Sequence, residues 1–292
     1  MSELVGQVIF GLAIGSIYSL LAIGFSMIYR ATGLLHFAHP DLMMIGGMVG
    51  YTLATRTQAP MIVLFVLSGL TVALLSCLID RFGFRPMRRQ GALLNLIIAT
   101  IGWSIILVNA ALFIWGTAPL SYPERYLPKG TPVYGVVIVP QNLVMLGVGL
   151  LSMVGLQVFF TRTSVGRALR ATAENPVAAQ LMGIRIERMM TLTFLISGFL
   201  AGGAGVLVAS IVYANFDLGL IGIKSFAAAV LGGFGQIGGA MVGGLVLGLV
   251  ETMAAFYISS AFKDIIAYTL LILVLLVRPN GLFGAGAGRP ES

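Results

Sequence analysis

Long apolar runs alternate with short polar gaps along the whole chain. The runs fall at about residues 5–29, 41–55, 61–79, 92–116, 140–160, 189–213, 236–258 and 264–278, and a shorter apolar piece covers 225–233. Most approach the roughly 20 residues that a helix needs to cross a bilayer. Their hydrophobicity is continuous, whereas strands of a membrane barrel would alternate in polarity. The pattern predicts an all-α integral membrane protein, a bundle of about eight transmembrane helices with one short re-entrant or half-helix segment.

Composition agrees with a protein whose solvent is mostly lipid. Of 292 residues, 58% are hydrophobic and 9% are charged, whereas a soluble domain carries about 25% charged residues. This excludes an ordinary cytosolic enzyme and a disordered chain. The first run is longer than the core of a signal peptide and no basic segment precedes it, so we expect a first helix. No polar stretch is long enough for a linker, and residues 1–292 are expected to form a single membrane domain.

Most basic residues stand in the gaps between the apolar runs. Gap 80–91 carries four arginines and one aspartate, and gap 161–188 carries five arginines and two glutamates. Cytoplasmic loops are enriched in Lys and Arg, so both gaps are expected inside and the proline-rich gap 117–139 outside. The N-terminus is then outside. The side of the C-terminus stays open, because it depends on whether 225–233 crosses. The net charge of +7 therefore indicates membrane orientation, and nucleic acid is not an expected partner.

Glycine is abundant, with 38 residues, and many lie four apart within the runs. Such spacing lets helix backbones approach closely in a membrane. Close packing within the chain is the simpler interpretation. The alternative is a moving or subunit-facing surface, for which the segments 198–205 and 232–248 are the candidates.

Few polar side chains stand inside the apolar runs, and such groups tend to face cavities or partners. Glu251 has no basic residue near it in sequence. It would lie on a pathway or gating interface, or else near a helix end against headgroups or a neighbouring helix. Lys224 and Asp217 are expected to be external loop charges. The candidate pathway or gating residues are His39, Asp41, Asn95, Gly235, Gly238 and Glu251.

His36, His39 and Asp41 are read as a polar cluster at a helix start, with Pro40 at an early helical position. Catalysis or metal binding by this cluster is the weaker alternative. The remaining chain has one cysteine and scattered carboxylates. We therefore expect no metal site, no catalytic residues and no enzymatic activity.

Glycines 233, 235 and 238 formally match G-x-G-x-x-G. A dinucleotide site of this kind needs a preceding strand and a βαβ unit, which a membrane span does not provide. A Walker A sequence is also absent from the chain. Any ATP hydrolysis is therefore assigned to another chain.

The segment 166–184 is too polar to span a membrane. Asn175-Pro176 marks a boundary, because the residue before proline avoids the helical region and proline suits the first helical position. We expect a short helix from Pro176 to Met182, capped by Gly183. It is either a plain connector or the element that passes motion from a soluble partner to the membrane helices.

Several ordered motifs resemble the branched-chain amino acid permeases of ABC importers, specifically the LivH-type subunit. They are 11–20 (GLAIGSIYSL), 37–42 (FAHPDL), 166–184, 229–235 (AVLGGFG) continuing through Gly248 and Glu251, and 278–283 (RPNGLF). Ala179 and Gly183 have the Ala-x-x-x-Gly spacing of the family's cytoplasmic coupling loop. The family usually has Asn-Phe-Ala-His-Gly, whereas this chain has His36 and Pro40 at the outer positions, which leaves the substrate open.

The resemblance implies an inner-membrane importer subunit that works by alternating access. Its partners would be a second, LivM-like permease, two cytoplasmic ATPases that hold ATP and Mg, and a periplasmic binding protein; the chain itself would hold no cofactor. Residues 161–188 would form the coupling loop, with Arg167, Arg170, Glu174, Asn175, Pro176, Ala179, Gly183 and Ile184 as its contact residues.

Three alternatives stand beside this hypothesis. Relatives of similar sequence import urea, short amides or aromatic acids. A stand-alone secondary transporter would use Glu251 and Asp41 to bind protons or sodium. An intramembrane enzyme ranks last, because no acid, base or nucleophile set is evident.

Overall fold

The computed structural model describes residues 2–88, 93–126, 130–133 and 136–284. The chain forms two compact units. Unit 1 comprises Met1–Ser26, Pro128–Met153 and Lys224–Ser292, and unit 2 comprises Met27–Leu127 and Val154–Ile223. The helices α1, α6 and α10 pass from one unit into the other.

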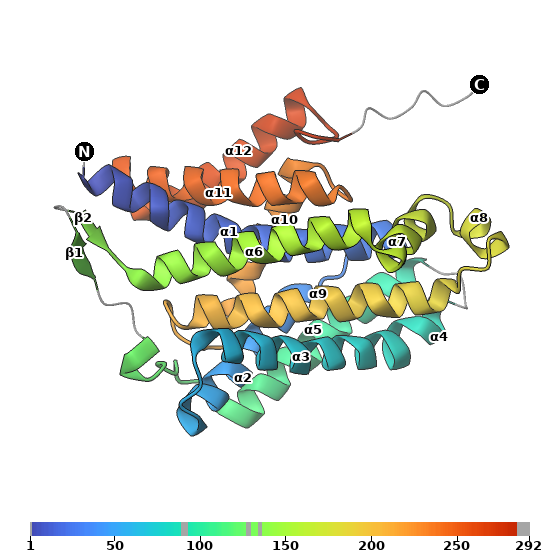
Figure 1. Cartoon of the computed structure of the whole chain (residues 1–292), viewed down its shortest axis with the longest axis horizontal. Coiled ribbons are helices and arrows are strands. Elements are labelled where there is room, and N and C mark those ends of the chain that lie inside the picture. The colour runs from blue at the N-terminus through green and yellow to red at the C-terminus, as the bar shows by residue number, and fades with distance from the viewer. Residues whose placement is uncertain (1, 89–92, 127–129, 134–135, 285–292) are drawn as a thin grey trace. The chain divides into compact units, whose positions relative to one another are not determined.

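Among the described residues, seven helical segments are long and apolar enough to cross a membrane. They contain α1 (Ser2–Thr32), α3 (Met61–Ile79), α5 (Leu93–Trp115), α6 (Pro140–Arg162), α9 (Ile186–Ala209), α11 (Ile237–Tyr257) and α12 (Lys263–Val277) (Figure 1). The shorter apolar helix is α10 (Leu218–Gly232). The prediction of a polytopic helical membrane protein is confirmed.

α2 (His39–Arg56) lies outside this set, although the sequence predicted a span there. In unit 2 it packs against α3, α5 and α9, and every residue from His39 to Met48 is buried. Because protein surrounds this helix where its polar residues stand, it tolerates a histidine and an aspartate that lipid would penalise.

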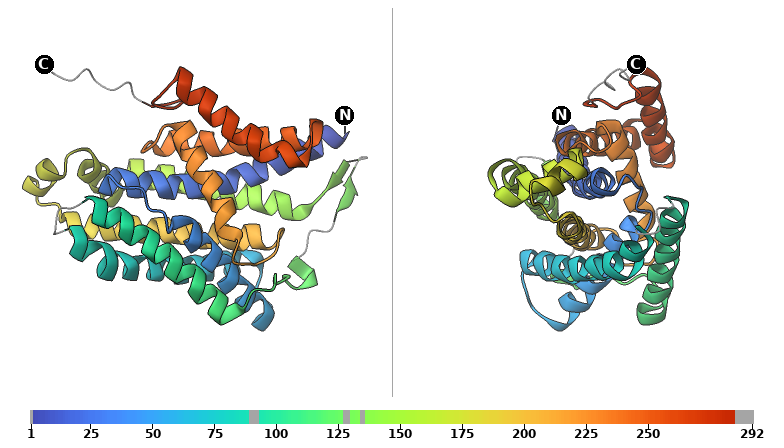
Figure 2. Two further views of the ribbon diagram at one scale, coloured as in Figure 1. Left: turned by 180° about the vertical axis from the view of Figure 1, so that it is seen from behind. Right: turned by 90° about the vertical axis from the view of Figure 1, so that its right-hand side faces the viewer.

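Close backbone packing defines unit 2. α3 and α9 run side by side (Figure 2), and α2 packs on both. A Cβ atom on Gly46 of α2 would overlap the backbone of Gly202 of α9, and one on Gly205 would overlap the carbonyl of Met43. Ser68 of α3 also donates a hydrogen bond of 2.6 Å to the Gly46 carbonyl. Glycine thus provides tight packing within the chain at these positions.

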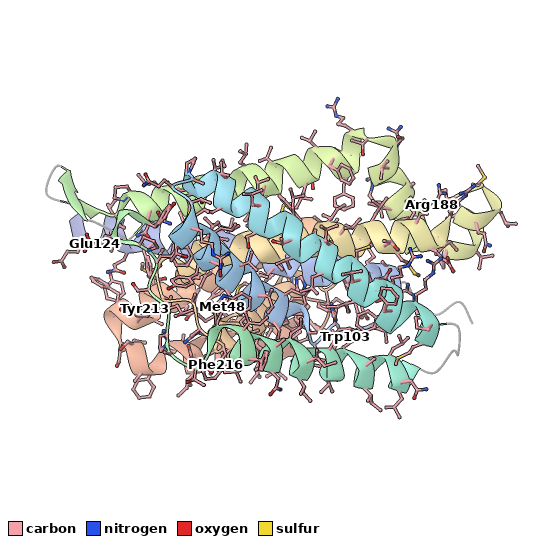
Figure 3. The ribbon with its side chains drawn as sticks, turned by 90° about the horizontal axis from the view of Figure 1, so that it is seen from below. Met48, Trp103, Glu124, Arg188, Tyr213 and Phe216 are labelled. Atoms are coloured by element: carbon pink, nitrogen blue, oxygen red, sulfur yellow. The ribbon has the colours of Figure 1, made fainter. Side chains whose placement is uncertain are left out.

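α3 continues into a π-helical turn, η1 (Asp80–Phe84), and a short helix, α4 (Arg85–Arg88). In the second basic gap, residues 161–188, the helices α7 (Ser164–Glu174) and α8 (Pro176–Leu181) precede α9. A 3-10 turn, η2 (Glu124–Tyr126), lies in the proline-rich gap. Glu124 and Arg188 lie at opposite ends of the unit 2 helices (Figure 3), as the predicted orientation requires.

In unit 1, α1 and α11 are antiparallel neighbours. Gly15 contacts Gly248 and Leu245, and the Ser19 hydroxyl donates a 2.6 Å hydrogen bond to the Met241 carbonyl. A turn at 233–236 joins α10 to α11 and brings Gly232 against Gly239. The 3-10 turn η3 (Ser260–Phe262) links α11 to α12. Elsewhere in the chain, the strands β1 (Thr131–Val133) and β2 (Val136–Ile138) form an antiparallel pair in which Thr131 lies opposite Ile138.

Gly11 and Phe283 lie at opposite ends of unit 1. Gly11, near the N-terminus, contacts Leu249 and Thr252 in the last turns of α11. The backbone amide of Phe283 instead donates a 3.2 Å hydrogen bond to the Gly232 carbonyl, beside the start of α11. The short apolar piece predicted at 225–233 begins earlier, at Leu218. The end of α10 packs against the first turns of α11, where Gly232 meets Gly239 and the Ala228 carbonyl lies beside Gly243.

Candidate functional site

α8 is a short helix whose ends are fixed by local chemistry. The side-chain Oδ1 of Asn175 accepts a 2.9 Å hydrogen bond from the Ala178 amide, and Pro176 follows at the first helical position. At the other end Gly183 has a φ of 82°, which glycine adopts without strain. The Ile184 amide donates to the Ala179 carbonyl at 3.0 Å. The predicted helix and glycine cap are therefore present, with Met182 as the capping residue rather than the last helical one.

α8 turns an apolar surface outward. Ala179 is 4% exposed and points inward, whereas Val177, Leu181 and Met182 are 68%, 84% and 83% exposed. These three side chains were missed in the sequence analysis. The spacing of Val177 and Leu181, four residues apart on a helix, was the available signal. An exposed apolar helix in a polar loop is typical of a surface that another protein covers.

Both ends of the loop are anchored to membrane helices of unit 2. Arg30 at the end of α1 pairs with Glu174 at the end of α7, at 3.2 Å. Asp80 is fully buried; it pairs with Arg88 at 2.8 Å and accepts a 3.0 Å hydrogen bond from the Thr191 hydroxyl of α9. Sequence reasoning did not single out Arg30 or Asp80. These contacts join the end of α7 to α1 and the start of α9 to the segment that follows α3.

The other predicted loop residues are less deeply engaged. Arg167 is exposed on α7, and Arg170 is half-buried. α7 itself is capped by Thr163, whose hydroxyl accepts a 2.9 Å hydrogen bond from the Gly166 amide. Leu169 lies on the buried face of α7, so this helix is fixed by its packing as well as by its cap.

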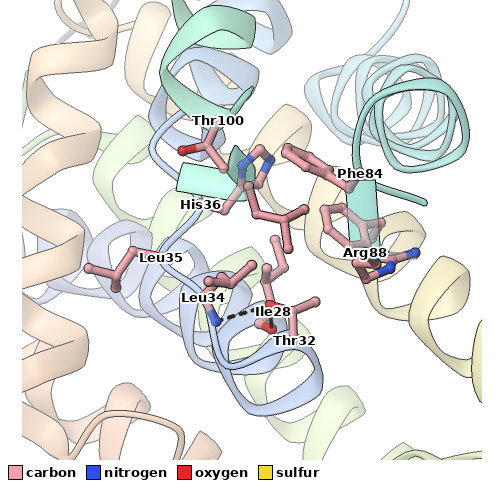
Figure 4. Close-up of a pocket in the computed structure, with 10 residues that line it drawn as sticks. Ile28, Thr32, Leu34, Leu35, His36, Phe84, Arg88 and Thr100 are labelled. Atoms are coloured by element: carbon pink, nitrogen blue, oxygen red, sulfur yellow. Dashed lines mark hydrogen bonds between the residues drawn. The ribbon is translucent and has the colours of Figure 1, made fainter. Parts of the chain in front are cut away.

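His36 occupies a small apolar cavity of about 10 Å³, the space of roughly one water molecule. Its ring lies between Thr100 and Phe84 (Figure 4), with the Phe84 and Phe194 ring centroids at 5.1 and 5.7 Å. Neither ring nitrogen has a hydrogen-bond partner within the described ranges of the chain. Burial, and secondarily His39, lowers the pKa of His36 to about 3, so the ring is neutral at physiological pH.

His39 and Asp41 lie on the first turn of α2, and Pro40 is at an early helical position as predicted. His39 is fully buried, with Nδ1 at 3.3 Å from the Ser197 hydroxyl. Asp41 is buried and hydrogen-bonded to Ser104. No group of three potential metal ligands occurs in the part of the chain that the structure describes.

The expectation for Lys224 is wrong, because Lys224 is buried on α10 rather than exposed in a loop. Its Nζ lies 2.6 Å from Glu251 Oε1 and 2.5 Å from Asp264 Oδ1. The Tyr18 hydroxyl donates a 2.8 Å hydrogen bond to Glu251 Oε2. This cluster of Tyr18, Lys224, Glu251 and Asp264 joins α1, α10, α11 and α12 within unit 1. Glu251 thus has the neighbouring-helix contact that the sequence left as one of two alternatives.

The remaining pathway candidates are divided between the two units. Asn95 is exposed in the first turn of α5. Gly235 stands in the turn before α11 with a φ of 85°, and Gly238 is exposed at the start of that helix. The G-x-G-x-x-G match therefore spans a helix-to-helix turn. His39, Asp41 and Asn95 belong to unit 2, and Gly235, Gly238 and Glu251 belong to unit 1.

In the described part of the chain, seven apolar helices are long enough to cross a membrane, and each unit holds a buried polar cluster. These features define a multi-pass membrane protein. Residues 7–275 match the family described as the permease component of the branched-chain amino acid transport system. The chain belongs to this family of permease components.

Curated relatives agree over nearly the full chain. The high-affinity branched-chain amino acid transport system permease protein BraD of Pseudomonas aeruginosa is 38% identical, over 98% of this chain and 96% of the relative. LivH of Escherichia coli K12 is 36% identical over the same shares. The ribose import permease RbsC of Haemophilus influenzae is 29% identical over 41% of this chain.

A solved structure shares the fold. PsaBC from Streptococcus pneumoniae, in complex with Fab, superposes with a TM-score of 0.51 at 11% identity. The match covers 94% of this chain and 92% of that chain. At this identity the likeness concerns the fold alone.

Proposed function

We propose that the chain is the permease subunit of an ABC importer that moves branched-chain or related amino acids across the inner membrane. Family membership and the branched-chain amino acid transport for which BraD and LivH are named support the substrate class. ATP and Mg belong to two cytoplasmic ATPase subunits. A LivM-like second permease and a periplasmic binding protein complete the complex.

One observation carries the proposal: α8 presents Val177, Leu181 and Met182 to solvent from a helix that is capped at both ends. The fixed ends of α8 are important, because a loop that deforms under force would not transmit the motion of an ATPase subunit. The apolar side chains would seat in a groove on one ATPase. Residues 161–188 would then act as the coupling loop.

The mechanism is alternating access. Closure of the ATPase dimer on ATP would move α8. The Arg30–Glu174 pair and the hydrogen bond from the Thr191 hydroxyl to Asp80 would carry this motion to the membrane helices. The glycine-rich segments 198–205 and 232–248 are our candidates for surfaces that slide during this change. The binding protein would release the amino acid on the external side.

Glu251 argues against the alternative of an ion-coupled transporter. A carboxylate that binds a proton or sodium in each cycle must be accessible, whereas Glu251 is 7% exposed and engaged by Lys224 and Tyr18. Its simplest role is to hold helices of unit 1 together.

The test of coupling is Leu181→Asp combined with Met182→Asp in the complete importer, reconstituted with its binding protein. A charged face would not enter an apolar groove, so ATPase activity stimulated by the loaded binding protein should fall at least tenfold. Val165→Asp is the matched control, because Val165 is an exposed apolar residue of the same loop on α7.

Assembly is measured by co-purification of the ATPase subunits. Unchanged stimulation in the Leu181/Met182 variant would refute coupling through α8. Uptake of labelled leucine against labelled urea by the same proteoliposomes tests the substrate class separately, and preference for urea would refute that part of the proposal.

A further inference from the structure

A groove of about 900 Å³ opens beside the start of α9. It lies in unit 2, at the end that carries Arg188 in Figure 3. One wall comes from η1 and α4, and the other comes from the end of α8 and the first turns of α9. This inner groove is separate from the exposed side chains Val177, Leu181 and Met182, none of which lines it.

The inner groove is strongly basic. Its charged lining residues are Arg81, Arg85, Arg185 and Arg188 against Glu187. Glu187 forms an ion pair with Arg85. Among the described residues, no ion pair engages Arg81, Arg185 or Arg188. The groove therefore presents three uncompensated guanidinium groups, which suit a phosphate oxygen geometrically and electrostatically.

Apolar residues extend the groove along α9. Leu192 and Leu195 line it one and two turns beyond Arg188, in the direction of the membrane span. Leu78 and Phe82, beside Arg81 in the chain, are exposed. The surface thus passes from arginines at the helix ends to apolar side chains along the span, the same order as headgroup and acyl chain in a phospholipid.

We propose that the inner groove binds an anionic phospholipid, with its phosphodiester on Arg81, Arg185 and Arg188 and an acyl chain along Leu192 and Leu195. A free phosphate would gain nothing from the apolar wall. A soluble anionic partner would likewise gain little from Leu192 and Leu195, which line the groove along the span. The lipid would brace α8 and the start of α9 against η1, so its presence would favour coupling. The inference rests on the inward orientation of this end of the bundle.

The test uses the assembled importer in detergent, titrated with phosphatidylglycerol and followed by native mass spectrometry. We compare wild type with Arg81→Gln/Arg188→Gln. Loss of each arginine is expected to weaken lipid retention about fivefold. Arg162→Gln is the matched control, because Arg162 is an exposed arginine at the end of α6 outside the groove. It should retain lipid as wild type does.

A second measurement separates binding from misfolding. The importer is reconstituted into vesicles of phosphatidylcholine alone or with phosphatidylglycerol, and ATPase activity with the loaded binding protein is recorded. Wild type should be stimulated by phosphatidylglycerol, whereas the double variant should match wild type in phosphatidylcholine and show no such stimulation.

Equal lipid retention by wild type and the double variant would overturn the proposal. So would a variant that loses activity equally in both vesicles, since the arginines would then serve folding or a protein partner. Failure of α8 coupling in the Leu181/Met182 variant would leave lipid retention unchanged, which keeps this inference distinct from the proposed function.

Discussion

At the scale of single residues, Lys224 has the largest consequence for stability. It neutralises Glu251 in a buried site and also reaches Asp264, which is half exposed. A buried carboxylate without its cation is costly, because desolvation is no longer offset by the ion pair. Tyr18 adds a hydrogen bond to the same carboxylate, so four helices of unit 1 depend on one ammonium group.

We therefore predict that Lys224→Met destabilises the protein by about 3 kcal/mol. Thermal unfolding in detergent measures the effect. Lys263→Met serves as the control, since Lys263 is exposed at the first position of α12 and should change the melting temperature little.

Adding Glu251→Gln to Lys224→Met removes the orphaned charge. The double variant should therefore recover part of the lost stability. If Lys224→Met and Lys263→Met melt alike, the cluster has no stabilising role.

At the scale of elements, the close packing of α2 on α9 is what holds unit 2 together. The two backbones approach so closely that glycine is needed on both helices, at Gly46 and Gly205. Apolar burial drives helices together only weakly within lipid, so close van der Waals contact is what holds α2 in place. That enclosure is also why α2 can carry His39 and Asp41.

Gly205→Ala should lower the thermal stability of the permease markedly, because the new methyl group would overlap the Met43 carbonyl. Gly102→Ala on α5 is the matched control, with no atom within 4 Å of the added Cβ. It should be neutral or slightly stabilising, since alanine is favoured over glycine in a helix by about 1 kcal/mol. Equal melting temperatures for the two variants would contradict the packing argument.

At the scale of the whole molecule, orientation follows from combining charge with connectivity. The positive-inside rule puts the gaps 80–91 and 161–188 in the cytoplasm and the N-terminus outside. Within unit 1 the segment that ends at residue 284 lies opposite to the N-terminus, by its contacts with Leu231 and Gly232. With that orientation, we predict that the segment up to residue 284 lies on the cytoplasmic side, which is one of the two alternatives that the sequence left open.

Single cysteines test this orientation in a Cys77→Ser background. Ser260→Cys, at the exposed link between α11 and α12, should react with a membrane-impermeant maleimide in intact cells. Phe283→Cys, which is also exposed, should react only after the membrane is permeabilised. The reverse labelling pattern would invert the whole topology, and equal labelling of both in intact cells would place the two ends on one side.

The sequence by itself determined the features that depend on neighbouring residues. Apolar runs long enough to span, basic gaps that set orientation, and the Asn175-Pro176 start and Gly183 end of α8 are all local. Each of these features could therefore be predicted without knowledge of the fold. The family resemblance was legible too, because its motifs are short and ordered along the chain.

Only the tertiary structure decided which distant residues meet. Lys224 and Glu251 are 27 residues apart, and neither apolar pattern nor spacing pairs them. Helix packing also decides three other features. They are the enclosure of α2, the exposure of Val177, Leu181 and Met182, and the gathering in one groove of arginines from η1, α4 and the start of α9. In lipid, hydropathy shows that a helix is buried in the membrane but not which face meets protein, so these contacts required the fold.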